Sequence, residues 1–288
     1  MRIGEDLTLD GLERILEHEA GDLTCTVEAG IRLSTLQAAL GQAEQRLALD
    51  PPGDPTIGAC LAAHLSGPLR HRFGAPRDLV LGVTLVLADG TIANAGGKVV
   101  KNVAGYDLGK LVCGSRGTLA LIARVSLRLH PVPVATGTVV VETADPAAVV
   151  AALMDSPLQP SAIDVLHPGR VAVLFEGGQA GVDDQLQRAL ALVGGREDGD
   201  DVWAESRARQ AAARGRVRFA PGALRETLAD LNEAVVRASA GVAYVPHETA
   251  PDHSALALEE RIRAAFDPSG TLAGSGLPCP TGGGTWKT

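Results

Sequence analysis

The stretch that decides the fold runs from Gly96 to Ile122, "GGKVVKNVAGYDLGKLVCGSRGTLALI", and holds six glycines among its 27 residues. Glycine destabilises an ordinary helix or strand, because it has more backbone freedom to lose on folding. A surface loop would account for the glycines, but not for the apolar residues threaded between them. We therefore expect a folded segment whose backbone approaches another group closely.

The composition argues against several classes of protein. The chain has 288 residues, 45% of them hydrophobic, which is enough for one or two cores. A net charge of −8 argues against a duplex nucleic-acid binder, and 3% aromatic residues are too few to stack single strands. No apolar run reaches about 18 residues, so the sequence predicts no transmembrane segment. The acidic N-terminus "MRIGEDLTLDGLERI" does not resemble a signal peptide.

The cysteines and histidines do not predict a metal site. The four cysteines are scattered and form no CxxC pair, so we expect buried small side chains. The nearest histidine cluster, "VPHETAPDHS", has the wrong spacing for HExxH and is interpreted as a loop.

The spacing of apolar residues predicts the elements of the first half of the chain. In order, we expect a helix over Leu9–Leu16, a strand over Leu23–Ala29, a helix that begins near Ser34, a helix over Ala59–Leu65, a hairpin that turns at Asp89–Gly90, and a strand in "LALIARVSLRLHPVP".

The pattern changes after Pro133, where we place a domain boundary. A strand, an alanine-rich helix, two strands around Pro168–Gly169 and another helix follow, an order typical of a ferredoxin-like α+β unit. We interpret residues 198–222 as a loop and an exposed helix, and "SALALEERIRAAF" as the last helix.

A second glycine-rich segment, "PPGDPTIGACLAAHLSGP", spans residues 51–68 of the same half. Glycines that expose backbone amides before a helix can form an anion-binding nest. Neither segment is a Walker loop or a GxGxxG fingerprint. From the residues alone two interpretations stay open, a nucleotide or flavin site, or tight turns in a crowded α+β core.

The two segments together resemble a known family. "DPPGDPTIGACLAAHLSGPLRHRFGAPRDLVLGVTLVLADGTI" and the run "KNVAGYDL.KL..GS.GTL" resemble the FAD-binding domain of the vanillyl-alcohol-oxidase and p-cresol-methylhydroxylase (PCMH) flavoproteins. They are most similar to the FAD-binding E subunits of bacterial glycolate oxidase. The resemblance covers residues 7–132 well and continues more weakly, with "FDPSGTLAGSG" similar to the family's closing motif.

This resemblance implies an α+β fold class. It implies a PCMH-type FAD-binding domain over residues 1–132, a smaller ferredoxin-like α+β cap domain over 133–265, and a closing motif and tail over 266–288. The family carries an earlier glycine-rich phosphate loop, so we expect this domain to be N-terminally incomplete and to hold FAD less tightly. Ala59 stands where the family has the second glycine of "IGG".

The resemblance also implies the residues that contact FAD. They are Pro52, Gly53, Thr56, Ile57, Gly58, Ser66, Gly67, Phe73, Gly74, Lys101, Asn102, Gly105, Tyr106, Asp107, Gly114, Ser115, Gly117, Thr118 and Ile122.

Other roles stay open for some of these residues and for the basic residues nearby. Asp107 could instead cap the following "LGKLV" turn, and Tyr106 and Phe73 could be core aromatics. The basic run from Arg70 to Arg77 offsets cofactor phosphate charge or forms a solvated edge.

The function implied by the resemblance is that of an FAD-dependent oxidoreductase, one subunit of a glycolate oxidase complex. Its substrate would be a small 2-hydroxy acid, and its partners a sister FAD-linked oxidase subunit and an iron–sulfur subunit. The expected location is the cytoplasm, peripheral to the inner membrane through that complex. We assign no catalytic base. The alternatives are a non-catalytic structural subunit that has lost tight FAD binding, and a flavin dehydrogenase that acts alone.

Overall fold

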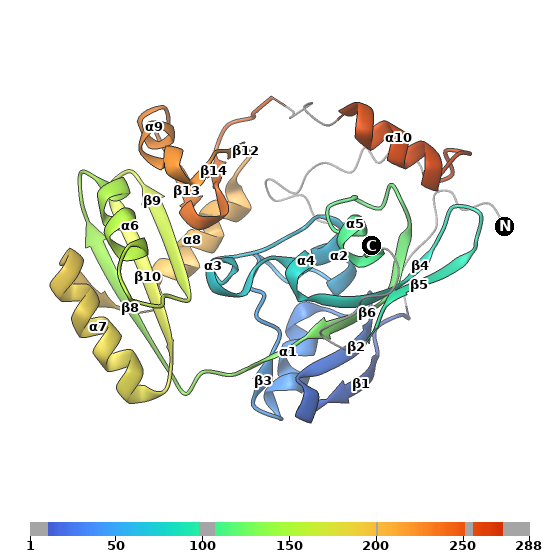
Figure 1. The fold of residues 1–288 in the computed structure, drawn as a ribbon, viewed down its shortest axis with the longest axis horizontal. Helices are drawn as coiled ribbons and strands as arrows, with labels where there is room; N and C mark the ends of the chain where they lie inside the picture. Colours follow the sequence, from blue (N-terminus) through green and yellow to red (C-terminus); the bar gives the residue numbers. More distant parts are fainter. Residues whose placement is uncertain (1–10, 98–106, 200, 251–255, 273–288) are drawn as a thin grey trace.

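The computed structural model describes residues 11–97, 107–199, 201–250 and 256–272. Two main sheets lie beside each other, and helices pack on both (Figure 1). Every pair of neighbouring strands in the two sheets is antiparallel. The predicted α+β class is therefore confirmed.

The first sheet has five strands in the order β1-β2-β6-β4-β5. Apolar residues alternate along β2 and β6, so one face of the sheet is buried against helices α1 and α2. Its strands are β1 (Ile15–Glu19), β2 (Thr24–Glu28), β4 (Val80–Val86), β5 (Ile92–Gly96) and β6 (Leu121–Arg128), and β3 (Gln45–Arg46) pairs separately with β7 (His130–Pro131). The helices of this half are η1 (Ala20–Asp22), α1 (Leu33–Gly41), α2 (Ile57–Ala62), α3 (Arg70–Phe73), α4 (Pro76–Leu79) and α5 (Leu108–Val112).

The helix predicted over residues 9–16 is wrong for the residues that the structure describes. Strand β1 begins at Ile15 and pairs antiparallel with β2. Arg14 supports this pairing, because its side chain donates to both carboxylate oxygens of Glu28 on β2, at 3.2 and 2.8 Å. Pairing with a neighbouring strand outweighs the helical spacing of the apolar residues.

The hairpin predicted around Asp89–Gly90 is confirmed. Strands β4 and β5 pair from Val86 with Ile92 onward. Gly90 adopts a φ of +85°, a conformation that glycine reaches at little cost, and Asp89 Oδ1 accepts the amide of Thr91 at 2.8 Å.

The second sheet contains the predicted ferredoxin-like unit. Its first four strands lie in the spatial order β11-β8-β10-β9, which is the 4-1-3-2 order of that unit. Helices α6 and α7 cover one face, where Val139, Phe175 and Leu186 belong to a common core. The elements are β8 (Ala135–Glu142), α6 (Pro146–Met154), β9 (Ala162–His167), β10 (Arg170–Gly177), α7 (Gln179–Val193) and β11 (Arg196–Asp198).

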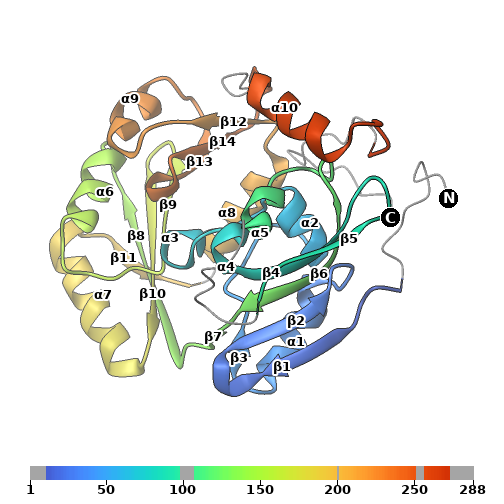
Figure 2. The ribbon, with the colours of Figure 1, turned by 45° about the vertical axis from the view of Figure 1, so that its right-hand side comes forward.

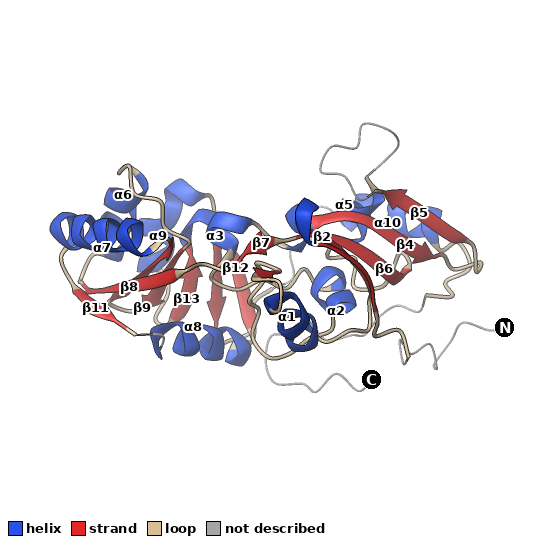
Figure 3. Cartoon of the chain, turned by 90° about the horizontal axis from the view of Figure 1, so that it is seen from below, coloured by secondary structure: helices blue, strands red, loops and turns tan. Residues whose placement is uncertain are grey.

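Three further strands extend this sheet, so it has seven strands. The helix predicted to be exposed, α8 (Asp201–Ala212), buries Val202 and Trp203 against the second face, and the Trp203 indole donates to Thr138 Oγ1 at 2.9 Å. Figure 3 shows α8 on one side of the sheet and α6, α7 and α9 on the other. The added elements are β12 (Gly215–Arg218), η2 (Pro221–Ala223), α9 (Leu224–Ala229), β13 (Ala234–Arg237), η3 (Ala238–Ala240) and β14 (Val242–Val245).

The two sheets are joined through α3 and by polar contacts (Figure 2). Arg46 forms a two-bond ion pair with Glu176 of β10, at 2.7 and 2.8 Å, and both side chains are largely buried. Gln210 of α8 donates to the carbonyl of Ser66 at 2.9 Å. The face of the second sheet that carries α8 therefore meets the first half of the chain.

The last described helix, α10 (Leu256–Phe266), returns to the first half, where Leu258 and Ile262 share a shallow groove with Leu111 of α5. After it, both carboxylate oxygens of Asp267 accept backbone amides of the closing motif, those of Thr271 and Leu272. The boundaries 1–132, 133–265 and 266–288 stay a prediction. Among the described residues, no helix is both long and apolar enough to cross a membrane.

Candidate functional site

The first glycine-rich segment forms the entry to α2. Thr56 caps this helix through its Oγ1, which accepts the amide of Ala59 at 3.2 Å. The amides of Ile57 and Gly58 donate to the carbonyls of Ile31 and Ala29, at 3.0 and 2.7 Å. All three amides therefore have partners within the chain, so this turn does not offer them to a phosphate.

Glycine at positions 67 and 74 is required by packing. A Cβ at Gly67 would overlap the carbonyl oxygen of Asp50 and lie 2.5 Å from its Oδ1. A Cβ at Gly74, where φ is +82°, would lie 2.6 Å from the Cβ of Asp78. These neighbours account for both glycines, whereas the cofactor contacts predicted for them stay a prediction.

The second glycine-rich segment folds onto the end of α2. The amides of Gly114 and Arg116 donate to the carbonyls of Leu61 and Ala62, at 2.9 and 2.8 Å. These bonds satisfy carbonyls that a helix leaves open at its C-terminus. Two segments about 50 residues apart are thus brought side by side.

The loop 113–118 leaves open space beside Gly117. Gly117 has a φ of +76°, and a Cβ there would meet no atom of the described residues within 4 Å. Gly53, in the loop that precedes α2, also has a positive φ of +73° and open space. Thr118 Oγ1 donates to the carbonyl of Ser115 at 2.6 Å. The open backbone at Gly117 and Gly53 suits close approach by a ligand.

The remaining predicted site residues fall into three groups. Ile122 is 5% exposed, so its side chain belongs to the core. Pro52 is half-buried in the loop before α2, and Ser66 is buried where the two sheets meet. The predictions for Lys101, Asn102, Gly105 and Tyr106 lie outside the described residues.

Asp107 takes the capping role that the sequence left open. It is the N-cap of α5, and its Oδ1 accepts the amide of Lys110 at 3.0 Å. Its other oxygen lies 3.2 Å from the Lys110 ammonium. Capping is confirmed, and a contact between Asp107 and FAD stays a prediction.

Phe73 packs at the junction between the sheets. Its ring meets the His130 ring edge to face, with centres 4.7 Å apart. The guanidinium carbons of Arg46 and Arg72 lie 5.2 and 5.7 Å from its centre. Phe73 is half-buried and belongs to none of the described hydrophobic cores, so the core role that the sequence left open is not confirmed, and a flavin contact stays a prediction.

Two polar atoms on the paired glycine segments, His64 Nε2 and Ser115 Oγ, are buried without a hydrogen-bond partner in the described part of the chain. His64 follows α2 with a φ of +52°. Burial lowers the pKa of His64 to about 4, and the positive charges of Arg70 and Arg77 act in the same direction. Sequence reasoning missed His64, because no motif marks it.

A positive cluster faces this place from both sheets. Burial lowers the pKa of Arg70 on α3, and the charges of Arg216 on β12 and Arg237 on β13 add to the effect. Arg237 is 2% exposed and pairs with Asp164 at 3.5 Å. Within the described ranges, Arg70 and Arg216 have no ion-pair partner. Such a cluster attracts an anion.

The buried polar groups around Arg237 are incompletely satisfied. Ser206 of α8 donates to Asp164 Oδ2, and the guanidinium of Arg237 lies over the Tyr244 ring at 5.1 Å. Arg237 Nε and Nη1, and Asp164 Oδ1, have no hydrogen-bond partner among the described residues. Burial also raises the pKa of nearby Asp50 above the usual range of a carboxyl. The space between the sheets is therefore polar.

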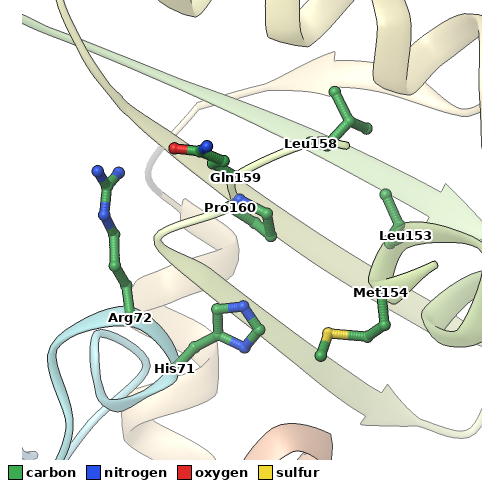
Figure 4. Close-up of a pocket in the computed structure, with 7 residues that line it drawn as sticks. All are labelled: His71, Arg72, Leu153, Met154, Leu158, Gln159 and Pro160. Atoms are coloured by element: carbon green, nitrogen blue, oxygen red, sulfur yellow. The ribbon is translucent and has the colours of Figure 1, made fainter. Parts of the chain in front are cut away.

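A described cavity lies elsewhere, at the outer end of α3. It has a volume of about 310 Å³, and Figure 4 shows His71 and Met154 on opposite sides of it. None of the residues predicted to contact FAD lines it.

The described residues contain no cluster of three or more metal-ligating side chains. Cys25 and Cys60 are buried as predicted, and Cys113 is half-buried. Burial raises the pKa of each of these thiols to about 12.

The residues present fit a flavin dinucleotide. Gly117 has a positive φ and open space in the loop that carries Ser115, and His64 Nε2 and Ser115 Oγ lack partners among the described residues. The positive charges of nearby arginines act on His64. A ligand with a large polar surface would fill the open space and hydrogen-bond the unpaired polar atoms. Its phosphate charge would neutralise the arginines.

Comparison with known proteins supports this reading. Residues 4–96 match the family described as FAD binding domain. The glycolate oxidase subunit GlcE of Escherichia coli K12 is 32% identical over 212 residues, which cover 72% of this chain and 59% of the E. coli protein. D-lactate dehydrogenase [cytochrome] 1, mitochondrial, of Saccharomyces cerevisiae is 31% identical over 179 residues, or 60% of this chain and 30% of the yeast protein.

A solved structure shares the fold. An alkyldihydroxyacetonephosphate synthase superposes with a TM-score of 0.63 at 17% identity, over 89% of this chain and 64% of that one. The chain thus spans less than two thirds of the length of each of these proteins.

Proposed function

Since residues 4–96 belong to the FAD binding domain family, we propose that this chain is the FAD-binding subunit of a 2-hydroxy-acid oxidoreductase of the glycolate oxidase type. The observation that carries the proposal is the pairing of two glycine-rich segments beside unsatisfied polar atoms. Relatives named as a glycolate oxidase subunit and as a D-lactate dehydrogenase support the substrate class.

The predicted FAD contacts divide into two kinds in this proposal. Gly53, Gly117 and the loop around Ser115 approach the cofactor, because space is open there. Gly67 and Gly74 do not contact the cofactor in this proposal, because Asp50 and Asp78 occupy the space beside them. These two glycines instead allow the close packing of the backbone that forms the site. When bound, FAD accepts a hydride equivalent from the α-carbon of the substrate.

The arginines between the sheets orient the substrate. A 2-hydroxy acid carries a carboxylate, and Arg70 and Arg216 offer positive charge with no carboxylate of the described chain bound to them. Their partial burial strengthens the attraction, since solvent screens it less. In this proposal the carboxylate binds between α3 and β12.

The proposed partners are a sister FAD-linked oxidase subunit and an iron–sulfur subunit, and the proposed location is peripheral to the membrane through that complex. The naming of a relative as a subunit of glycolate oxidase supports this arrangement. Co-purification of the tagged chain with both partners from the native cell tests it, and recovery of the chain without either partner contradicts it.

The test of function is anaerobic reduction of bound flavin. The chain is loaded with FAD and mixed with glycolate or D-lactate, and the oxidised flavin absorption band is followed. We expect the band to bleach, and pyruvate, which has no α-hydrogen on a carbinol carbon, to leave it unchanged. Arg216→Gln should raise the substrate concentration for half-reduction about tenfold or more, whereas Arg188→Gln on exposed α7 should not. FAD binding without reduction would instead support the non-catalytic structural subunit.

A further inference from the structure

Each of the two paired glycine-rich segments carries one buried polar atom that lacks a partner among the described residues. His64 Nε2 and Ser115 Oγ are both buried and have no hydrogen-bond partner among the residues that the structure describes. Native proteins pair the great majority of such atoms, because burying a polar group without a partner is unfavourable. Two such atoms on segments that pack against each other indicate a missing ligand or missing water.

The two atoms belong to one wall that both segments build. A Cβ placed on Gly114 would lie 3.7 Å from the Cβ of His64, and the Gly114 amide is bonded to the carbonyl of Leu61. His64 also holds a φ of +52°, which is unusual for a residue other than glycine. Such a conformation is often retained at ligand sites, where the surroundings determine it.

The charges around His64 define its chemical state. Arg70, Arg77 and Arg216 face it with positive charge, and Asp78 is the one acidic group that acts on it appreciably. The imidazole is therefore neutral near pH 7, and its Nε2 is available as a neutral donor or acceptor. Ser115 Oγ has the same versatility. Both suit the polar edge of an uncharged ring system or sugar.

We propose that His64 and Ser115 form a hydrogen-bonding pair for bound FAD, contributed by the two glycine-rich segments together. This proposal rests on the proposed function, since FAD supplies the polar atoms that complete the pair. It makes His64 a cofactor-binding residue, and it gives Ser115 a side-chain role.

The test compares FAD affinity in matched variants. His64→Ala and Ser115→Ala are titrated with FAD, and the quenching of flavin fluorescence gives the dissociation constant. We expect each variant to bind FAD about three to ten times more weakly than the parent chain, the range for loss of one neutral hydrogen bond. The absorption band of the bound flavin should also shift.

The controls remove similar groups elsewhere. His130 also has a buried nitrogen without a partner and a pKa lowered by burial to about 4, but it packs against Phe73 at the sheet junction. His130→Ala should leave FAD affinity unchanged. Ser126→Ala, which removes a hydroxyl bonded to Thr26 on the sheet, should do the same.

The outcomes separate the two proposals. If the parent chain binds FAD and both His64→Ala and Ser115→Ala bind it equally well, the inference is wrong and the proposed function stands. If the parent chain does not bind FAD, the proposed function fails and the inference fails with it. If His64→Ala does not fold, Ser115→Ala decides alone, because this loop substitution removes only a hydroxyl.

Discussion

Replacing Gly67 with alanine should strongly lower the free energy of unfolding of this chain, even when no cofactor is present. The added Cβ would overlap the carbonyl oxygen of Asp50 and lie 2.6 Å from its carbonyl carbon. Ordinary carbon contacts need about 3.4 Å or more, so the Asp50 backbone would have to move by about 0.8 Å or more. That backbone is held in place, because Asp50 Oδ1 also accepts the amide of Leu69 at 3.1 Å.

The expected cost follows from overpacking against backbone. Inserting a methyl group into a packed site costs typically about 1–3 kcal/mol, and a rigid neighbour places Gly67→Ala at the upper end. For a chain of this size, about 3 kcal/mol lowers the melting temperature by roughly 6–12 °C. Gly117→Ala is the matched control, since it meets open space and pays only the strain of a positive φ, about 1 kcal/mol.

The assay is thermal and urea unfolding of both variants without FAD, followed by circular dichroism. Gly67→Ala should be destabilised clearly more than Gly117→Ala. In a separate FAD titration, Gly117→Ala should bind FAD more weakly than the parent chain, although its stability changes little. If Gly67→Ala unfolds at the same temperature as the parent chain, the packing explanation for this glycine is wrong.

Two further predictions concern the sheet junction and the buried histidines. Glu176→Ala should destabilise the chain by about 3–5 kcal/mol, because it leaves Arg46 largely buried without its partner. Arg188→Ala breaks an exposed ion pair and should cost under about 1 kcal/mol. Equal unfolding midpoints of the two variants in urea would contradict this prediction. The pKa values of His64 and His130 are lowered to about 4, so the unfolded chain binds more protons than the folded chain between about pH 6.5 and pH 4, and their contribution to stability is lost as the pH falls through that window. The variant His64→Ala/His130→Ala should lose less stability than the parent chain from pH 7 to pH 4, and parallel losses would refute the assignment.

Local features of this chain could be predicted from sequence. The cap at Asp107 and the turn at Asp89–Gly90 depend on residues within three positions of each other. The ferredoxin-like unit was predictable for the same reason, since each strand and helix shows its own pattern and turn residues. These features hold regardless of what packs against them.

Features set by distant neighbours could not be predicted. Strand β1 depends on pairing with β2, which overrides its own helical spacing. Strands β13 and β14 are four residues each, too short to show a period. Gly67 and Gly117 look alike in sequence, and only the position of Asp50 shows that one serves packing and the other faces open space.

The missed site residue has the same explanation. His64 follows a short helix in a run of unremarkable residues. Its lack of a hydrogen-bond partner is a property of the surrounding three-dimensional structure, and so are the arginines that α3 and β12 direct toward it. The glycine pattern leads to the proposed cofactor site, but it does not indicate which other side chains would belong to that site.

The central claim is that FAD binds where the two glycine-rich segments meet. Hydrogen exchange of the backbone amides, measured with and without saturating FAD, tests it most directly because it reports the place of binding. We predict that protection on adding FAD concentrates in residues 52–67 and 107–118, and that strands β8 and β10 of the second sheet exchange as before. Protection confined to the second sheet, or no change anywhere at saturating FAD, would contradict the account.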